Sequence, residues 1–158
     1  MNANVAWASF PSPVGTLTAF IINNQLSALE WGRAPAPEDG RPATVLLAEV
    51  RRQLDDYFDA RREAFGLPLA PAGSDFQKAV WQAMTAIPCG ETRTYGDLAN
   101  ALGSSARAVG TACGKNPIPI IIPCHRVLGA NGRLTGYSGG AGTETKVQLL
   151  RLEGANLV

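Results

Sequence analysis

The adjacent residues Cys124 and His125 are the types best suited to nucleophilic chemistry in this chain. His125 is the only histidine of the 158 residues, and the pair follows an isoleucine-rich stretch that Pro123 closes. A thiol attacks as its thiolate, which a nearby imidazole held by a carboxylate can generate. Neighbouring side chains on a strand point to opposite faces, so the two could cooperate only through a sharp turn after Pro123 or through a water. Glu153 is a candidate for the orienting carboxylate.

The other cysteines, Cys89 and Cys113, are better explained as small apolar residues of a core. Three cysteines without a close-spaced pair indicate neither a disulfide framework nor a C-x-x-C site. A tetrahedral zinc site would need all three together with His125, two of its ligands being adjacent in sequence. We therefore expect no metal and no cofactor.

The composition, with 46% hydrophobic residues and a net charge of +1, predicts a globular protein. The chain shows no secretory signal and no apolar run long enough for a membrane span, which predicts a soluble, cytoplasmic protein without a membrane partner. The charges are uneven, because residues 93–133 carry five Lys or Arg against Asp97 alone. This region could face an anionic partner.

The first third of the chain predicts a small α/β unit. Residues 5–10, 16–22 and 26–31 are β-prone, with an Asn-Asn turn signal between the last two. A helix of about four turns should follow and pack on these strands through Leu47, Val50, Leu54, Tyr57 and Phe58. No catalytic cluster occurs there, so we predict a structural domain over residues 1–70, and a linker at residues 67–73.

Residues 71–158 are predicted to form a second, mainly helical domain. A Ser74/Gln77 capping box should start a helix whose buried stripe is Phe76, Val80, Met84 and Ile87. Two short helices should follow, joined by a Gly-Ser turn after Leu102, with Ala106, Val109 and Cys113 facing inward on the second. Such a pair is either a helix-turn-helix or an ordinary packing unit.

The second of these short helices carries few long side chains. Arg107 is the exception in its first turn, and the remaining exposed positions are expected to be Ala108, Gly110, Thr111, Ala112 and Gly114. A surface this sparse suits a minor groove about 6 Å wide better than a major groove, whose readers carry several long polar side chains. We therefore expect contacts to DNA backbone and shape.

The end of the chain contains three further expected elements. The run Ile118 to Ile122 predicts a core strand, and the glycine-rich residues 127–140 predict a hairpin at Asn131-Gly132 and a loop that could wall a pocket. Thr143 should cap a last helix that ends near Glu153.

Several motifs, in order, resemble the O6-alkylguanine-DNA alkyltransferase family, whose members are also named methylated-DNA-protein-cysteine methyltransferases. They are IPCGETRTYGDLA, RAVG, NPIPIIIPCHRV, LTGYSGG and LLRLEG, and they extend from about Gly73 to Gly154. The resemblance implies an α+β protein, with a small amino-terminal α/β domain before a helix-turn-helix, winged-helix-like domain that binds DNA and performs catalysis. It also implies irreversible transfer of the alkyl group from O6-alkylguanine, and from O4-alkylthymine, in duplex DNA to the cysteine after base flipping.

The resemblance assigns roles to the matching positions. Cys124 would accept the alkyl group, His125 would act as base through a water, and Glu153 would orient His125. Asn116 would brace the turn before the cysteine. Tyr95 would help to rotate the nucleotide, with Arg107 filling its place in the duplex. The remaining positions implied to contact DNA or the flipped base are Thr94, Ala108, Gly110, Val127, Tyr137 and Ser138.

Some questions stay open in the sequence. Residues 141–145, AGTET, are more numerous than the resemblance leads us to expect, and Arg126 could be an ion-pair partner or a phosphate contact. A non-catalytic module that binds alkylated bases is the main alternative function, but it should lack Cys124. A cysteine hydrolase would need a separate histidine and an oxyanion loop, and a transcription regulator a dimer interface. We expect a monomer with no obligate protein partner.

Overall fold

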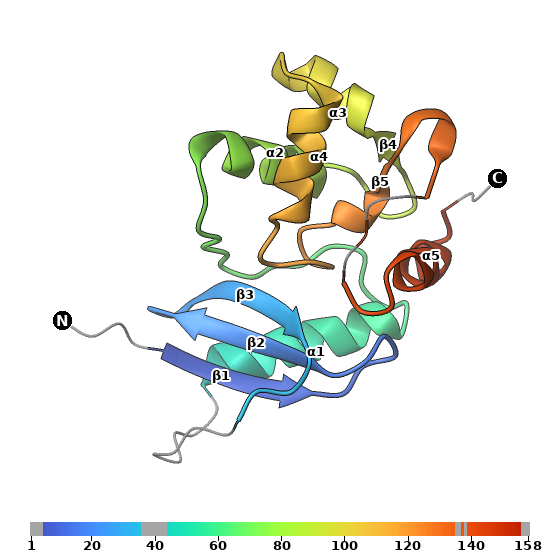
Figure 1. Ribbon diagram of the computed structural model, residues 1–158. Coiled ribbons are helices and arrows are strands. Elements are labelled where there is room, and N and C mark those ends of the chain that lie inside the picture. The colour runs from blue at the N-terminus through green and yellow to red at the C-terminus, as the bar shows by residue number, and fades with distance from the viewer. Residues whose placement is uncertain (1–4, 36–43, 135–136, 138, 156–158) are drawn as a thin grey trace. The chain divides into compact units, whose positions relative to one another are not determined.

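The computed structural model describes residues 5–35, 44–134, 137 and 139–155 of the α+β chain, which divides into two compact units (Figure 1). The amino-terminal unit comprises residues 1–72 and the carboxy-terminal unit residues 73–158. Among the described residues, no helix is both long and apolar enough to cross a membrane.

The amino-terminal unit is an antiparallel sheet of three strands with one helix packed on it. Its strands β1 (Val5–Phe10), β2 (Leu17–Ile22) and β3 (Gln25–Trp31) are arranged in the order β1-β2-β3. Asn23 and Asn24 join β2 to β3 with φ values of 51° and 60°, the left-handed pair that a tight hairpin turn requires. The Asn-Asn signal therefore predicted this hairpin correctly.

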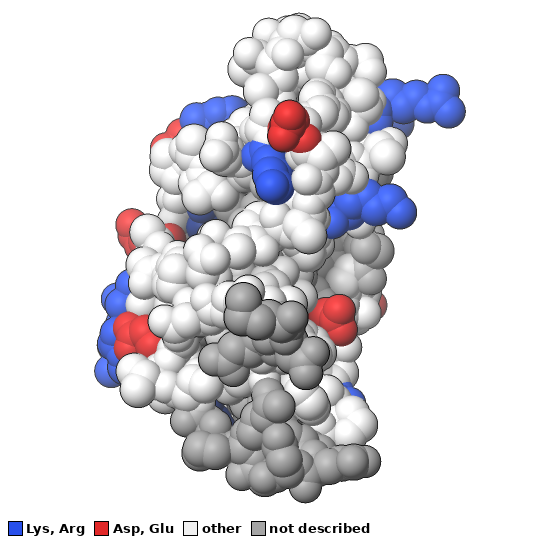
Figure 2. Space-filling model, turned by 90° about the vertical axis from the view of Figure 1, so that its left-hand side faces the viewer, with Lys and Arg blue, Asp and Glu red and all other residues white. Residues whose placement is uncertain are grey.

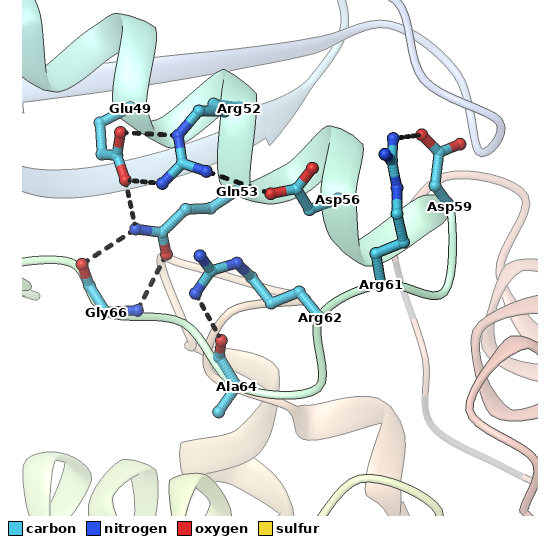
Figure 3. Close-up of polar contacts among 9 residues, drawn as sticks. All are labelled: Glu49, Arg52, Gln53, Asp56, Asp59, Arg61, Arg62, Ala64 and Gly66. Carbon is cyan, nitrogen blue, oxygen red and sulfur yellow. Dashed lines mark hydrogen bonds and ion pairs between the residues drawn. The ribbon is translucent and has the colours of Figure 1, made fainter.

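Helix α1 (Val45–Phe58) begins at Thr44, whose side chain accepts a hydrogen bond from the Leu47 amide. The helix buries the predicted stripe except Phe58, which is only partly covered. It also buries Gln53, whose side-chain amide donates to the Gly66 carbonyl at 3.1 Å and accepts from the Gly66 amide at 2.8 Å (Figure 3). A buried amide paired in this way with backbone fixes the chain that leaves the helix.

The stretch predicted as a linker is partly structured. Leu69 forms a parallel bridge with Leu26 of β3, with hydrogen bonds of 2.8 Å from the Leu26 amide to the Pro68 carbonyl and 2.9 Å from the Ala70 amide to the Leu26 carbonyl. Its prolines do not prevent this, because they lie where no ladder donor is needed.

The carboxy-terminal unit starts with α2 (Asp75–Thr85), which has the predicted Ser74/Gln77 capping box. Val80 and Met84 are buried as predicted, but Phe76 is 37% exposed. Trp81 is buried instead, and its indole nitrogen donates to the Ala112 carbonyl at 2.9 Å. The prediction that Phe76 belongs to the buried face of α2 was wrong, because the first turn of the helix extends beyond the core.

Helices α3 (Tyr95–Leu102) and α4 (Ala106–Gly114) form the predicted pair. Gly103 ends α3 in the left-handed region with φ 63°, and Ser105 caps α4. The inward face of α4 differs by one step from the prediction, because Ala112 is buried and Ala106 is exposed. On this buried face the carbonyl of Ala112 accepts the hydrogen bond from Trp81 of α2.

Residues 118–122 are not the predicted strand. They form turns, in which the Ile121 amide donates to the Pro119 carbonyl at 2.9 Å and Ile120 has φ 74°. An isoleucine in this region is strained, because its branched Cβ crowds the backbone. All three isoleucines of the run 120–122 are nevertheless buried, so packing holds them in this conformation.

The remaining elements also differ from the predictions. Strand β5 (Val127–Leu128) pairs in parallel with β4 (Arg93–Thr94) rather than with a hairpin partner, and the Asn-Gly signal lies in the short 3-10 helix η2 (Ala130–Gly132). Helix α5 (Thr143–Leu152) has Gly142 as its N-cap, so Thr143 is its first residue and not the predicted cap. The hydroxyl of Thr145 instead accepts a hydrogen bond from the Ala141 amide at 2.8 Å.

Candidate active site

Cys124 and His125 lie on a tight turn, which is one of the two arrangements that the sequence left open. Pro123 has φ −82° and ψ 67°, and the Cys124 amide donates to the Ile122 carbonyl at 2.8 Å. This is an inverse γ-turn, and it leads directly into the 3-10 helix η1 (Cys124–Arg126). The turn removes the strand alternation that would have separated the two side chains.

Asn116 braces the loop that precedes the cysteine. Its side-chain nitrogen donates to the Ile122 carbonyl at 2.8 Å, and its side-chain oxygen accepts from the Ile118 amide at 2.9 Å. One amide thus holds both ends of the strained isoleucine turns. Such bonds are what allow an unfavourable φ to persist beside a site.

His125 is fully buried and forms a hydrogen bond of 2.7 Å between its Nε2 and Oε2 of Glu153. Glu153 follows α5 directly, and its side chain has no exposed surface. Arg126 binds the same carboxylate through Nε at 2.9 Å and Nη2 at 3.0 Å, and donates to the Ile87 carbonyl at 2.6 Å. Since Arg126 is only 5% exposed, it is an ion-pair partner of Glu153 and does not reach a phosphate.

The electrostatics of His125 suit a general base. Burial lowers the pKa of His125, although the bond to Glu153 opposes this shift. The imidazole is therefore neutral near pH 7, and its Nε2-H donates to Glu153. Its Nδ1, buried and without a hydrogen-bond partner among the described residues, carries the lone pair. That nitrogen can accept a proton through a water.

Cys124 retains some exposed surface, yet burial raises the pKa of its thiol. The Asn116 side chain, the positive charge of Lys146 and the backbone amides of Cys124 and His125 act in the opposite direction. The resting sulfur is thus a thiol, and a base must remove its proton before it can attack.

Lys146 is a buried residue that the sequence reasoning missed. It is 1% exposed, and its Nζ donates to the Val127 carbonyl at 2.6 Å. Burial lowers the pKa of Lys146 to about 8, and interaction with the ionised forms of Cys124 and Cys113 opposes this shift in part. The sequence did contain a sign of this burial, because Lys146 precedes the buried Leu149 and Leu150 by three and four residues and so lies on the same helix face.

Two tyrosines lie near the sulfur. Burial first and then the charges of Cys113 and Cys124 raise the pKa of Tyr95 to about 12, and burial together with Cys124 raises that of Tyr137 further. Both hydroxyls therefore stay protonated at neutral pH and can donate hydrogen bonds. Val127 is fully buried, and the predicted Ser138 lies outside the described residues.

The α4 helix presents the expected sparse surface. Arg107 and Thr111 are exposed, and Ala108 and Gly110 are partly so. Gly110 lies beside Tyr95, since a Cβ at that position would be 4.0 Å from Cδ1 of the tyrosine ring, an ordinary contact distance. Thr94 starts α3 through its own capping box with Asp97, so its hydroxyl is engaged within the helix.

An open depression of about 470 Å³ lies between α4 and the first turn of α2. Arg107 is one of its walls, and the others are Ser74, Phe76, Gln77, Ser105, Ala108, Thr111 and Ala112. Where this unit faces the viewer in Figure 2, uncharged atoms predominate, and the basic side chains stand apart from one another. Contacts of this surface with an anion would therefore depend on a small number of charges.

Two family models match adjacent parts of the chain. Residues 5–71 match the 6-O-methylguanine DNA methyltransferase, ribonuclease-like domain, and residues 75–155 match the DNA binding domain of the same family. The chain belongs to the 6-O-methylguanine DNA methyltransferase family. The described residues contain no group of three or more His, Cys, Asp or Glu that could hold a metal ion.

Relatives of this methyltransferase family resemble nearly the whole chain. The methylated-DNA-protein-cysteine methyltransferase of Methanosarcina barkeri is 50% identical over 152 residues, covering 92% of this chain and 95% of the relative. The crystal structure of Mycobacterium tuberculosis O6-methylguanine methyltransferase is 41% identical, covers 96% of this chain and 93% of that chain, and has a TM-score of 0.82. The Mycobacterium tuberculosis protein OGT in complex with DNA has the same TM-score of 0.82, with 42% identity over 94% of this chain and 92% of that chain.

Proposed function

We propose that the protein repairs DNA by direct reversal, transferring the alkyl group of O6-alkylguanine to its own Cys124. Membership of the methyltransferase family and a structural relative solved with DNA support the reaction and the DNA partner. The observation that carries the assignment of Cys124 is the buried 2.7 Å contact between Glu153 and the histidine that follows the cysteine. Only this cysteine of the three has such a base beside it.

The transfer is an in-line displacement. The Cys124 proton passes through a water to Nδ1 of His125, and Glu153 stabilises the imidazolium that forms. The sulfur then bonds to the alkyl carbon while the bond from that carbon to O6 breaks and leaves its electrons on guanine. The proton held by His125 is given back through water, guanine takes up one proton in exchange and is released as the neutral base, and Tyr95 lies beside it as a hydrogen-bond donor. Because the thioether is stable, each molecule acts once.

The alkylated base must leave the duplex, since its reacting carbon is otherwise inaccessible. Helix α4 enters the minor groove, where its small residues Ala108 and Gly110 permit close approach, and Arg107 fills the place of the flipped nucleotide. Val127 and Tyr137 line the base pocket, to which the family resemblance also assigns Ser138, and O4-alkylthymine is a second substrate. Residues 71–158 perform these steps and residues 1–70 support them, in a cytoplasmic monomer that needs no obligate protein partner.

A non-catalytic module that binds alkylated bases is disfavoured. Such a module needs the base pocket and Arg107 but has no use for a thiol with a buried base and carboxylate behind it. The observed arrangement of Cys124, His125 and Glu153 therefore favours transfer over binding alone.

Intact-protein mass spectrometry tests the proposal. After incubation with a duplex containing one O6-methylguanine, we expect the mass of a single methyl transfer, located at Cys124 by peptide mapping. The Cys124→Ala variant should bind the duplex without gaining mass, while Cys89→Ala should react normally. Multiple turnovers, or modification of a different cysteine, would refute the assignment.

A further inference from the structure

The carboxylate of Glu153 is shared by two side chains that can both carry positive charge. Its Oε2 contacts Nε2 of His125 at 2.7 Å and Nη2 of Arg126 at 3.0 Å, and its Oε1 accepts from Nε of Arg126 at 2.9 Å. None of the three side chains is more than 6% exposed. Because an uncompensated buried charge is strongly unfavourable, the charges within this group must nearly balance.

This balance decides the charge of His125. Arg126 stays protonated, and with ionised Glu153 it forms a neutral pair. A protonated His125 would add a second positive charge to the same carboxylate. Burial lowers the pKa of His125, the bond to Glu153 opposes this shift, and the charges of Arg126 and Lys146 add to it. We therefore expect a neutral imidazole in the resting protein.

The surrounding elements do not change this expectation. Helices α2 and α5 pack against the 3-10 helix η1, which carries His125 between Cys124 and Arg126. Lys146 and Glu153 face it from α5 and its end. The other charged side chains of the two helices are exposed, and they are Asp75, Lys78, Glu144 and Arg151.

The same pair also decides which nitrogen of His125 carries the proton. An ionised carboxylate can only accept hydrogen bonds, so the neutral imidazole must donate its Nε2-H to Glu153. The lone pair is then on Nδ1, which is buried and has no hydrogen-bond partner among the described residues. Arg126 thus selects the basic nitrogen through the carboxylate that it shares with the histidine.

The geometry of Arg126 suits this role better than that of a lysine. Nε and Nη2 make a two-pronged contact with the carboxylate, and Nη1 donates to the Ile87 carbonyl at 2.6 Å, so the plane of the guanidinium is fixed. Three residues after Ile87, Gly90 lies against the backbone of Glu153, since a Cβ at Gly90 would be 3.1 Å from the Glu153 carbonyl oxygen. Residues 87–90 therefore contact both members of the ion pair.

We propose that Arg126 is a positioning residue of the transfer reaction, which holds the Glu153 carboxylate ionised and oriented so that His125 keeps its basic lone pair on Nδ1. This inference rests on the proposed function of Cys124. Because the carboxylate is already shared with Arg126, it stabilises the imidazolium only in part, and His125 returns its proton readily.

Loss of Arg126 should draw a proton into the pair of His125 and Glu153. The proton can remain on the imidazole as imidazolium, or it can reside on the carboxyl group, which then donates to Nε2 and leaves the imidazole in its Nδ1-H form. Both outcomes remove the lone pair from Nδ1. The base for Cys124 would be lost in either case.

The first test uses the full-length wild-type protein without a tag. His125 is the only histidine, so its ring signals need no assignment. Heteronuclear NMR that correlates the carbon-bound ring protons with both ring nitrogens distinguishes the neutral Nε2-H form, the neutral Nδ1-H form and imidazolium. We expect the Nε2-H form at pH 7, and either of the other forms in the wild type would overturn the inference.

The second test compares variants by the same NMR measurement and by single-turnover reaction with free benzylguanine. Arg126→Met removes the charge and the two-pronged contact, whereas Arg126→Lys keeps the charge alone. Arg151→Met is the matched control, because Arg151 is an exposed arginine two residues before Glu153. Circular dichroism establishes that each variant is folded.

Arg126→Met should lose the Nε2-H form at pH 7 and transfer the benzyl group at least about tenfold more slowly, the equivalent of a pKa shift of about one unit. The loss should shrink at alkaline pH, where the thiol of Cys124 ionises unaided. Arg126→Lys should keep the Nε2-H form and react at a rate between those of wild type and Arg126→Met. Arg151→Met should match wild type in both measurements.

A folded Arg126→Met protein that keeps the Nε2-H form would overturn the inference, as would a loss of rate that is the same at every pH. Should Arg126→Met fail to fold, a wild-type rate in Arg126→Lys would show that the two-pronged contact is not needed and would contradict the positioning role. A wild-type protein in the Nε2-H form that gains no methyl group at Cys124 from the O6-methylguanine duplex would instead contradict the proposed function.

Discussion

Replacing Glu153 with glutamine should reduce stability as well as repair. The carboxylate accepts hydrogen bonds from His125 Nε2 at 2.7 Å and from Arg126 Nε and Nη2 at 2.9 and 3.0 Å. The glutamine amide keeps one accepting oxygen, but its NH2 group replaces the second oxygen and would face one of the N-H donors of His125 or Arg126. It also leaves Arg126, which is 5% exposed, as a buried charge without its counter-ion.

The expected magnitude follows from that uncompensated charge. Breaking a buried ion pair by removing one partner costs about 3 to 5 kcal/mol in the free energy of unfolding. The remaining bond from Arg126 to the Ile87 carbonyl, 2.6 Å long, offsets part of the loss. We therefore expect a loss of about 3 kcal/mol for Glu153→Gln. The double variant Arg126→Met/Glu153→Gln should recover at least about 1 kcal/mol, because neither charge then remains unpaired.

Urea unfolding followed by tryptophan fluorescence measures this difference. Trp81 is the reporter for the carboxy-terminal unit once Trp7 and Trp31 are replaced with phenylalanine. Glu144→Gln is the matched control, since Glu144 is an exposed acid in the first turn of the same helix and should change stability by less than about 1 kcal/mol. Equal stability of Glu153→Gln and Glu144→Gln would show that the Arg126 contact contributes little, and would refute the reasoning.

Three further variants test other parts of the structure. Arg107→Ala should slow repair of duplex DNA at least tenfold more than reaction with free benzylguanine, since only the duplex requires base flipping; equal losses in the two single-turnover assays would contradict the role. His125→Ala should slow transfer at pH 7 and partly recover at alkaline pH, where the thiol ionises unaided; a pH-independent deficit would contradict the base. Gly73→Ala should lower the free energy of unfolding by about 1 to 3 kcal/mol, because its Cβ would lie 2.5 Å from Cη2 of Trp81. Gly114→Ala, which meets nothing within 4 Å, should not destabilise the protein in the same urea experiment.

Much of the secondary structure was predictable because local rules decided it. The Ser74/Gln77 box, the Ser105 cap and the Gly103 end all satisfy backbone groups with side chains a few residues away or supply a left-handed φ. Strand alternation and helical periodicity similarly reflect which face is buried. The proposed nucleophile could be singled out in the same way, since the only histidine follows Cys124.

The isoleucine run shows where local rules fail. A short apolar run indicates burial but not backbone conformation, and the strand that the sequence predicts at Ile118 to Ile122 is wrong for that reason. Tertiary contacts decided otherwise, because the side-chain amide of Asn116 binds both ends of the segment and packing holds Ile120 at φ 74°. The result is the sharp turn at Pro123 that brings Cys124 and His125 into one site.

By itself, then, the sequence determined the starts of α2 and α4, the hairpin at Asn23 and the choice of Cys124 and His125 as the proposed reactive pair, because each depends on neighbours along the chain. Only the tertiary structure decided what surrounds that pair. Arg126 became a partner of Glu153 although 27 residues separate them, and Lys146 reached the Val127 carbonyl across 19. Whether a charged side chain is solvated or buried depends on which distant segments cover it, and no local pattern of a single sequence records that.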